Sequence, residues 1–394
     1  MTFHRLREEL LALFSLGVAE PLPDPAFNDL ALRVFRFQCE ANPGYGGFVA
    51  RRGLDPDGVS RWEGIPLLPA RAFKSFPLVS GDLKETERIF RTSGTTAGTQ
   101  VRGEHHVRDL ALYRGSLLPN FRAHLLPEGV PMPVLCLLPS PDAAPDSSLS
   151  FMMGEVVGAF GAREGATRDG EGPVSVGGNA VGTPVGPGGG FFVHPERGIE
   201  IGPFKEALET AVTGTGPVLL AGTAFAFVQW LEVVEKEGWR VPLPEGSRIM
   251  ETGGYKGRTR ALSRADLYRS LRGAFGVPAE RIVNEYGMTE LLSQFYEPVM
   301  TLDDRVGERF HRGPPWVRTR VLDPLTLEEA PEGELGVLAH LDLANLGSVA
   351  AILTEDLGRR VPGGFHLVGR SRGAEPRGCS LAMEDFLAAL GEGP

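Results

Sequence analysis

Hydroxyls and glycines alternate in one segment of this 394-residue sequence, and the segment is its strongest chemical signal. The run Thr-Ser-Gly-Thr-Thr-Ala-Gly-Thr occupies residues 92–99 and follows the apolar pair Ile89-Phe90. We expect a strand that enters a tight turn, where backbone N–H groups can cradle an anion and hydroxyls can donate to phosphate oxygens. The ending of a Walker loop is missing, so an ordinary Ser/Thr-rich hairpin turn is an equal alternative. The candidate phosphate-binding residues are Thr92, Ser93, Gly94, Thr95, Thr96 and Gly98.

A second polar segment follows the apolar pair Ile282-Val283 and contains an aromatic residue, a glycine, a hydroxyl and a carboxylate. Tyr286 could stack on a nucleobase, and Thr289, two residues after Gly287, could donate to a phosphate. Glu290 could hold Mg²⁺, a hard cation that prefers oxygen ligands. Taken alone, the segment is explained better as a strand end followed by a helix cap.

Two more segments complete a pattern that extends over most of the chain. Residues 353–358 contain Asp356, and Gly369-Arg370 follows them. In this order, the four segments resemble those of the adenylate-forming (acyl-activating) superfamily. The resemblance implies that Asp356 binds the ribose hydroxyls of AMP and that Arg370 lies close to the domain hinge of such enzymes.

Within that superfamily, the sequence is similar to the LuxE-type acyl-protein synthetases. The stretches that carry this finer resemblance are residues 65–74, 222–225, 251–258, 284–296 and 373–381. It implies that ATP, with Mg²⁺, and a carboxylic acid, typically a fatty acid, give an acyl-adenylate and pyrophosphate. The acyl group then moves to a cysteine of the enzyme, for delivery to an acyl-reductase or another acceptor protein. Cys379 is the candidate acceptor because it lies in the matching Arg-Gly-Cys-Ser segment, where Arg377 could favour the thiolate.

The sequence departs from the superfamily in its lysines. The lysine that usually ends the phosphate loop is missing, and Arg102 could substitute for it. The last lysine is Lys256, a candidate catalytic cation in a Gly-Gly-Tyr-Lys-Gly run, so the C-terminal part carries no lid lysine. Arg370 or Arg372 could stabilise phosphate there, since guanidinium groups bind it well.

Two other functions stay open. An acyl-CoA ligase of the phenylacetate type would transfer the acyl group to free coenzyme A. A nucleotide- or acyl-binding protein without turnover would explain the missing lysines. His105 and His106, which follow the phosphate-binding segment, could either assist phosphate contacts or pack in the interior.

The helices and strands expected around these residues indicate an α/β fold. Helical spacing of apolar residues occurs in the first 45 positions, in two helices around Phe3–Phe14 and Phe27–Phe35. Further helices are expected over 107–124 and 224–236 and after a Ser263/Asp266 capping box, and strands over 134–138, 218–221, 282–284 and 337–341. The Gly- and Pro-rich tract 169–190 predicts a mobile surface loop.

We therefore expect an adenylate-forming core of mixed sheets packed with helices, with three parts. These are a helical N-terminal segment (1–85), an AMP-binding adenylation core (86–366) and a minimal C-terminal cap with the acceptor cysteine (367–394).

Composition excludes several other classes of protein. The formal net charge of −10 gives no basic surface for nucleic acid. No uncharged apolar run approaches the roughly 20 residues of a membrane span. Three cysteines far apart in sequence argue against a disulfide framework or a zinc site, and Glu8 and Glu9 make the N-terminus unlike a signal peptide. We expect a cytoplasmic protein.

Overall fold

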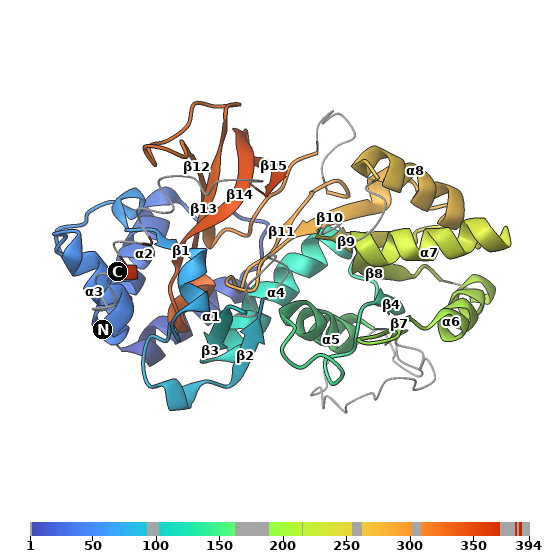
Figure 1. Cartoon of the computed structure of the whole chain (residues 1–394), viewed down its shortest axis with the longest axis horizontal. Coiled ribbons are helices and arrows are strands. Elements are labelled where there is room, and N and C mark those ends of the chain that lie inside the picture. The colour runs from blue at the N-terminus through green and yellow to red at the C-terminus, as the bar shows by residue number, and fades with distance from the viewer. Residues whose placement is uncertain are drawn as a thin grey trace. The chain divides into compact units, whose positions relative to one another are not determined.

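A computed structural model describes residues 2–92, 102–161, 189–214, 216–253, 262–301, 309–370, 383, 386 and 387 (Figure 1). The chain divides into two compact units. The first unit comprises Met1–Asn120, Met288–Phe295 and Glu308–Pro394, and the second comprises Phe121–Gly287 and Tyr296–Gly307. These units are defined by spatial contacts, and the three functional parts expected at 1–85, 86–366 and 367–394 stay a prediction.

The second unit is built on a six-stranded sheet with the strand order β11-β10-β9-β8-β4-β5. The pairings from β10 through β9, β8 and β4 to β5 are all parallel. The strands of this sheet are β4 (Val134–Leu137), β5 (Gly189–Phe191), β8 (Leu219–Thr223), β9 (Arg248–Thr252), β10 (Ile282–Tyr286) and β11 (Phe295–Tyr296). The other elements are α5 (Ser148–Phe160), β6 (Val193–His194), β7 (Gly198–Ile199), α6 (Ile201–Thr213), α7 (Ala224–Glu237), α8 (Arg264–Phe275) and η4 (Ala279–Arg281).

The central strands of this sheet are buried along their whole length rather than on alternate residues. All residues of β4, β9 and β10 are buried, as expected for parallel strands that are covered on both faces. Helices α7 and α8 lie side by side against the sheet (Figure 1). Trp230 of α7 and Phe204 of α6 are fully buried in the core that these helices share with the strands.

The first unit contains a second sheet, in which β1, β14, β13 and β12 follow one another and β15 pairs with β14. The elements of the first unit before residue 121 are α1 (Phe3–Ser15), α2 (Asp24–Ala41), α3 (Pro43–Arg51), η1 (Trp62–Gly64), β1 (Leu68–Pro69), η2 (Ala70–Lys74), η3 (Leu83–Glu85), β2 (Arg88–Arg91) and β3 (Glu104–Val107). Helix α4 (Leu110–Leu125) begins in this unit and ends in the second. The later elements are β12 (Val317–Leu322), β13 (Leu335–Asp342), η5 (Leu343–Gly347), β14 (Ala351–Val361) and β15 (Gly364–Arg370).

Strands β2 and β3 form a hairpin that closes the Ser/Thr/Gly-rich segment. The ladder continues one pair beyond the strands: Thr92 N–H donates to the Gly103 carbonyl at 2.9 Å, and Gly103 N–H donates to Thr92 Oγ1 at 2.8 Å. The prediction that a strand enters this segment after Ile89-Phe90 is confirmed. We call Thr92 and Gly103 the closing pair.

Most of the predicted elements are present, with three corrections. Helix α4 begins at Leu110 rather than at residue 107, because Val107 pairs with Arg88 in the hairpin. A third helix, α3, begins after Asn42, whose side chain caps it. Gly189 and Gly190, predicted in the loop, belong to β5, where Gly189 adopts φ 110° against the Val134 backbone. The rest of the loop, 169–188, lies outside the described residues.

Among the residues that the structure describes, no helix is both long enough and apolar enough to cross a membrane.

The expected capping box at the start of α8 provides a test of the second unit. Ser263 Oγ accepts the Asp266 N–H at 3.1 Å and donates to Asp266 Oδ2 at 2.6 Å. Ser263→Ala should lower the free energy of unfolding by about 1 kcal/mol, because a first-turn N–H loses its acceptor. Urea unfolding monitored by far-UV circular dichroism measures this loss.

The matched control is Ser270→Ala, an exposed position on the same helix. Alanine has the better helix propensity there, so this variant should be unchanged or slightly more stable. Equal effects of the two substitutions would contradict the capping role.

Candidate active site

The predicted site residues divide between described and undescribed parts of the chain. Those that the structure describes are Thr92, Tyr286, Gly287, Thr289, Glu290, Asp356 and Arg370. Those outside the described residues are Ser93, Gly94, Thr95, Thr96, Gly98, Lys256, Arg372, Arg377 and Cys379.

Four charged side chains share one neighbourhood of the first unit, and Glu290 lies among them. Glu290 is 7% exposed, and this burial raises the pKa of its carboxyl to about 7. The charges of Arg370 and Lys74 lower that pKa, whereas the charge of Asp356 raises it. Asp356 of β14 and Arg370 of β15 are register partners in the sheet. Three residues predicted from separate motifs are thus brought together, with Lys74 as an unpredicted fourth.

The Arg370 guanidinium is held by a carboxylate that it shares with another arginine. Arg370 Nη2 lies 3.0 Å from Glu355 Oε2, and Arg71 Nε lies 2.6 Å from Glu355 Oε1. Because both ion pairs are partly exposed, they contribute orientation more than stability. They hold the Arg370 side chain at the end of β15.

Buried side chains hold the backbone on which Glu290 lies. His105 donates from Nδ1 to the Thr289 carbonyl at 2.8 Å, and Asn345 donates from Nδ2 to the Glu290 carbonyl at 2.8 Å. His105 comes from strand β3, so one hydrogen bond joins the hairpin to the turn that carries Glu290. Asn345 comes from η5.

Asp342 holds the residues that follow the turn. Its fully buried carboxylate accepts the N–H groups of Leu292 at 3.1 Å and Ser293 at 2.9 Å, the Ser293 hydroxyl at 2.7 Å, and the Ala344 N–H at 3.0 Å. Burial raises the pKa of Asp342, and these donors oppose the rise. One carboxylate therefore fixes this segment against strand β13.

His105 is an interior residue rather than a phosphate ligand. Its ring is 1% exposed and lies edge-on against Phe73, with 5.4 Å between ring centroids. Burial lowers the pKa of His105 to about 4, so the imidazole is neutral at pH 7. Of the two roles expected for this histidine, the structure supports packing.

In the second unit, the carboxyl ends of β9 and β10 carry buried polar groups. Glu251 accepts the Tyr268 hydroxyl at 3.0 Å and Asn284 Nδ2 at 2.6 Å, and Glu285 accepts the Thr252 hydroxyl. Burial raises the pKa of Glu251 and of Glu285 to about 7. This strand edge is therefore less negative near neutral pH than two ionised carboxylates would make it.

Tyr286 and Gly287 follow directly from that edge. Tyr286 ends β10 and is 7% exposed, whereas Gly287 is exposed. Parallel sheets bind ligands outside the carboxyl ends of their strands, and both residues lie there. Their contact with a nucleotide base stays a prediction.

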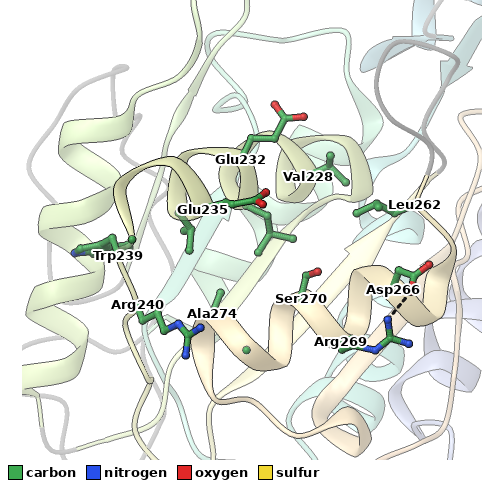
Figure 2. A pocket seen from close by; sticks show the side chains of 14 residues that line it. Val228, Glu232, Glu235, Trp239, Arg240, Leu262, Asp266, Arg269, Ser270 and Ala274 are labelled. Atoms are coloured by element: carbon green, nitrogen blue, oxygen red, sulfur yellow. Dashed lines mark hydrogen bonds and ion pairs between the residues drawn. The ribbon is translucent and has the colours of Figure 1, made fainter.

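The described residues also contain a groove that is separate from the predicted chemistry. It has a volume of about 710 Å³. Figure 2 shows it between α7 and α8, with Glu232 and Glu235 of α7 and Arg269 of α8 among the side chains that line it. None of the predicted site residues is among its lining residues.

Two charged residues of the site were not assigned a role from sequence. Lys74 ends the 65–74 stretch, and Glu355 precedes Asp356, so both lie in segments that carried the resemblance. Nothing in their local spacing connects them with Glu290 or Arg370, because only the sheet and the hairpin bring these segments together.

Comparison with known sequences identifies the family to which the chain is similar. The family model described as acyl-protein synthetase, LuxE, matches residues 189–388, about half of the 394-residue chain. The long-chain-fatty-acid–luciferin-component ligase of Aliivibrio fischeri is 30% identical over 152 residues, which cover 35% of this chain and 38% of the relative. The ligase of the same name from Vibrio harveyi is 27% identical over 154 residues, covering 37% and 39%. The chain thus matches under two fifths of the length of these curated relatives.

Solved structures of 2-hydroxyisobutyryl-CoA ligase are similar in fold. The open conformation, in complex with 2-HIB-AMP and CoA, gives a TM-score of 0.56 at 15% identity and covers 89% of this chain and 71% of the ligase. The postadenylation state with R3-HIB-AMP gives 0.58 at 15% identity, covering 88% and 67%. At this identity the similarity shows the fold alone, and it confirms the expected α/β architecture of the adenylate-forming type.

The raised pKa of Glu290 predicts a pH-dependent cost in stability. Between its ordinary pKa of 4.5 and the folded value of about 7, the folded protein binds more protons at this group than the unfolded chain does. The contribution of Glu290 to stability therefore falls as the pH rises through that window. Glu290→Gln should be more stable than the wild type at pH 8 and close to it at pH 5.

Urea midpoints of both proteins at the two pH values measure this difference, and Glu332→Gln, at an exposed position of the first unit, is the control. A wild type that is more stable than Glu290→Gln at pH 8 would contradict this prediction. It would mean that the groups around Glu290 offset the whole cost of burying its charge.

Proposed function

Because the chain belongs to the LuxE acyl-protein synthetase family, we propose that it uses ATP to activate a carboxylic acid, in the first place a fatty acid, as an acyl-adenylate. The observation that carries the proposal is the convergence of Glu290, Asp356 and Arg370 in one neighbourhood of the first unit. These residues come from three separate segments, and a common ligand accounts for their convergence.

In the proposed first step, a carboxylate oxygen of the acid attacks the α-phosphorus of ATP. The bond from that phosphorus to the bridging oxygen breaks, and pyrophosphate leaves with the electron pair. Asp356 would accept hydrogen bonds from the ribose hydroxyls, and the Arg370 guanidinium would balance charge on the phosphates. Thr92 and the segment after it would donate hydrogen bonds to phosphate oxygens. Tyr286 and Gly287 are the proposed contacts of the base.

Magnesium fits this proposal through Glu290. The nearby positive charges offset only part of the unfavourable effect of burial on the Glu290 carboxylate. Such a carboxylate is a suitable ligand for a divalent cation. Among the residues that the structure describes, no three His, Cys, Asp or Glu side chains are grouped to hold a metal ion. Phosphate oxygens and water would therefore complete the coordination, as is usual for Mg²⁺ at nucleotide sites.

In the proposed second step, the Cys379 thiolate attacks the acyl carbonyl carbon, a thioester forms, and AMP leaves. The other two cysteines are poor nucleophiles. Burial raises the pKa of Cys39 to about 12 and that of the fully buried Cys136 further still. The thioester would then be passed to an acceptor protein such as an acyl-reductase.

Acid-dependent exchange of labelled pyrophosphate into ATP tests the first step. We expect exchange with at least one member of a panel of fatty and aromatic acids, and transfer of label from the acid to the protein, seen as a thioester in intact-mass spectra. Cys379→Ser should keep the exchange and lose the thioester, because adenylation does not need the thiol.

Cys39→Ala is the matched control and should retain both activities. If Cys379→Ser makes acyl-CoA when coenzyme A is added, the phenylacetate-type ligase is the correct assignment. ATP binding without exchange for every acid would instead indicate a binding protein without turnover.

A further inference from the structure

We propose that Lys74 is a further catalytic residue of this site, whose ammonium contacts the phosphates of bound ATP. The inference rests on the proposed function and names a source of positive charge for a step that needs it. Phosphate charge in a partly buried site must be balanced by fixed cations. The chain has five lysines, and the last of them is Lys256.

The backbone at Lys74 is fixed between the two elements that form the site. Lys74 is the last residue of η2, which directly follows β1. Pro69 of β1 pairs with Leu353, three residues before Asp356 on β14. The preceding residue, Phe73, is 2% exposed and packs against the His105 ring of the hairpin. The position of Lys74 is therefore defined relative to strand β14 and to strand β3 of the hairpin.

The stem of the Lys74 side chain lies against the closing pair. A Cβ atom added to Gly103 would come 3.1 Å from Thr92 Cγ2 and 3.4 Å from Lys74 Cγ. Residues 93–101 join Thr92 to Arg102, so both ends of the candidate phosphate-binding segment are tied next to this lysine. The absence of a side chain at position 103 leaves room for the stem.

The charge of Lys74 acts on the same neighbourhood. It interacts electrostatically with the carboxylate of Glu290. In the part of the chain that the structure describes, other cations nearby are engaged: Glu355 pairs with Arg71 and Arg370. Arg102, which was expected to replace a lysine, donates to the carbonyl oxygen of Thr92 at 2.5 Å.

Lys74 is half-buried, and no hydrogen bond or ion pair with a described residue occupies its ammonium group. A compact ammonium on a flexible stem is well suited to phosphate oxygens, which it binds as a point charge. During adenylation it would stabilise the negative charge that remains on the phosphates as pyrophosphate leaves.

Lys74→Met tests the assignment, because it keeps the length of the stem and removes the charge. We expect acid-dependent pyrophosphate exchange to fall about 10- to 100-fold in kcat/KM for ATP. By calorimetry, ATP should bind about 10-fold more weakly, whereas adenosine, which has no phosphate, should bind as in the wild type. Lys74→Arg should recover part of both losses.

Lys84→Met is the matched control, since Lys84 is exposed on the neighbouring η3, and it should match the wild type throughout. Unchanged exchange and ATP affinity in Lys74→Met would overturn the inference. An equal loss of affinity for ATP and adenosine would also overturn it, because it would indicate general damage to the site.

These outcomes separate the inference from the proposed function. If the wild type binds ATP but exchanges pyrophosphate with no acid, the proposed activity fails, and the comparison of ATP with adenosine still decides the role of Lys74. If the wild type does not bind ATP, both proposals are wrong.

Discussion

The site depends on one buried network that fixes the backbone after Gly287. Asp342 accepts four hydrogen bonds, three of them from Leu292 and Ser293, while His105 and Asn345 hold the carbonyls of Thr289 and Glu290. Leaving one such buried group without its partner costs about 1–3 kcal/mol, so the arrangement is stable only when it is complete. Without it, Glu290 would have no fixed position relative to Asp356 and Arg370.

This network keeps a carboxylate where burial disfavours its charge. The nearby charges of Arg370 and Lys74 oppose the effect of burial on Glu290, yet its pKa is still raised to about 7. A fold that optimised stability alone would place an amide or an apolar side chain at this position. The retention of a destabilised acid beside cations is typical of a site prepared for a charged ligand.

The candidate site residues that the sequence predicts are those that carry a local signature. Glu290 and Asp356 were predicted because each lies in a short motif, and α7 and α8 because apolar spacing and a capping box mark them. Lys74, Glu355 and His105 have no such signature. Their roles arise from the pairing of β1 with β14 and from the hydrogen bond between His105 and Thr289, which lie 184 positions apart. A single sequence does not encode such long-range contacts in its spacing. The pKa values of Glu290 and His105 could not be predicted either, since both follow from burial.

The hydrogen bond from His105 to Thr289 has a thermodynamic consequence. It joins the hairpin that leads into the Ser/Thr/Gly-rich segment to the turn that carries Glu290. If the segment binds phosphate and Glu290 binds a cation, as we propose, this hydrogen bond links the two binding events. Linkage requires the coupling to be reciprocal: whatever factor the cation adds to the affinity for the nucleotide, the nucleotide adds to the affinity for the cation.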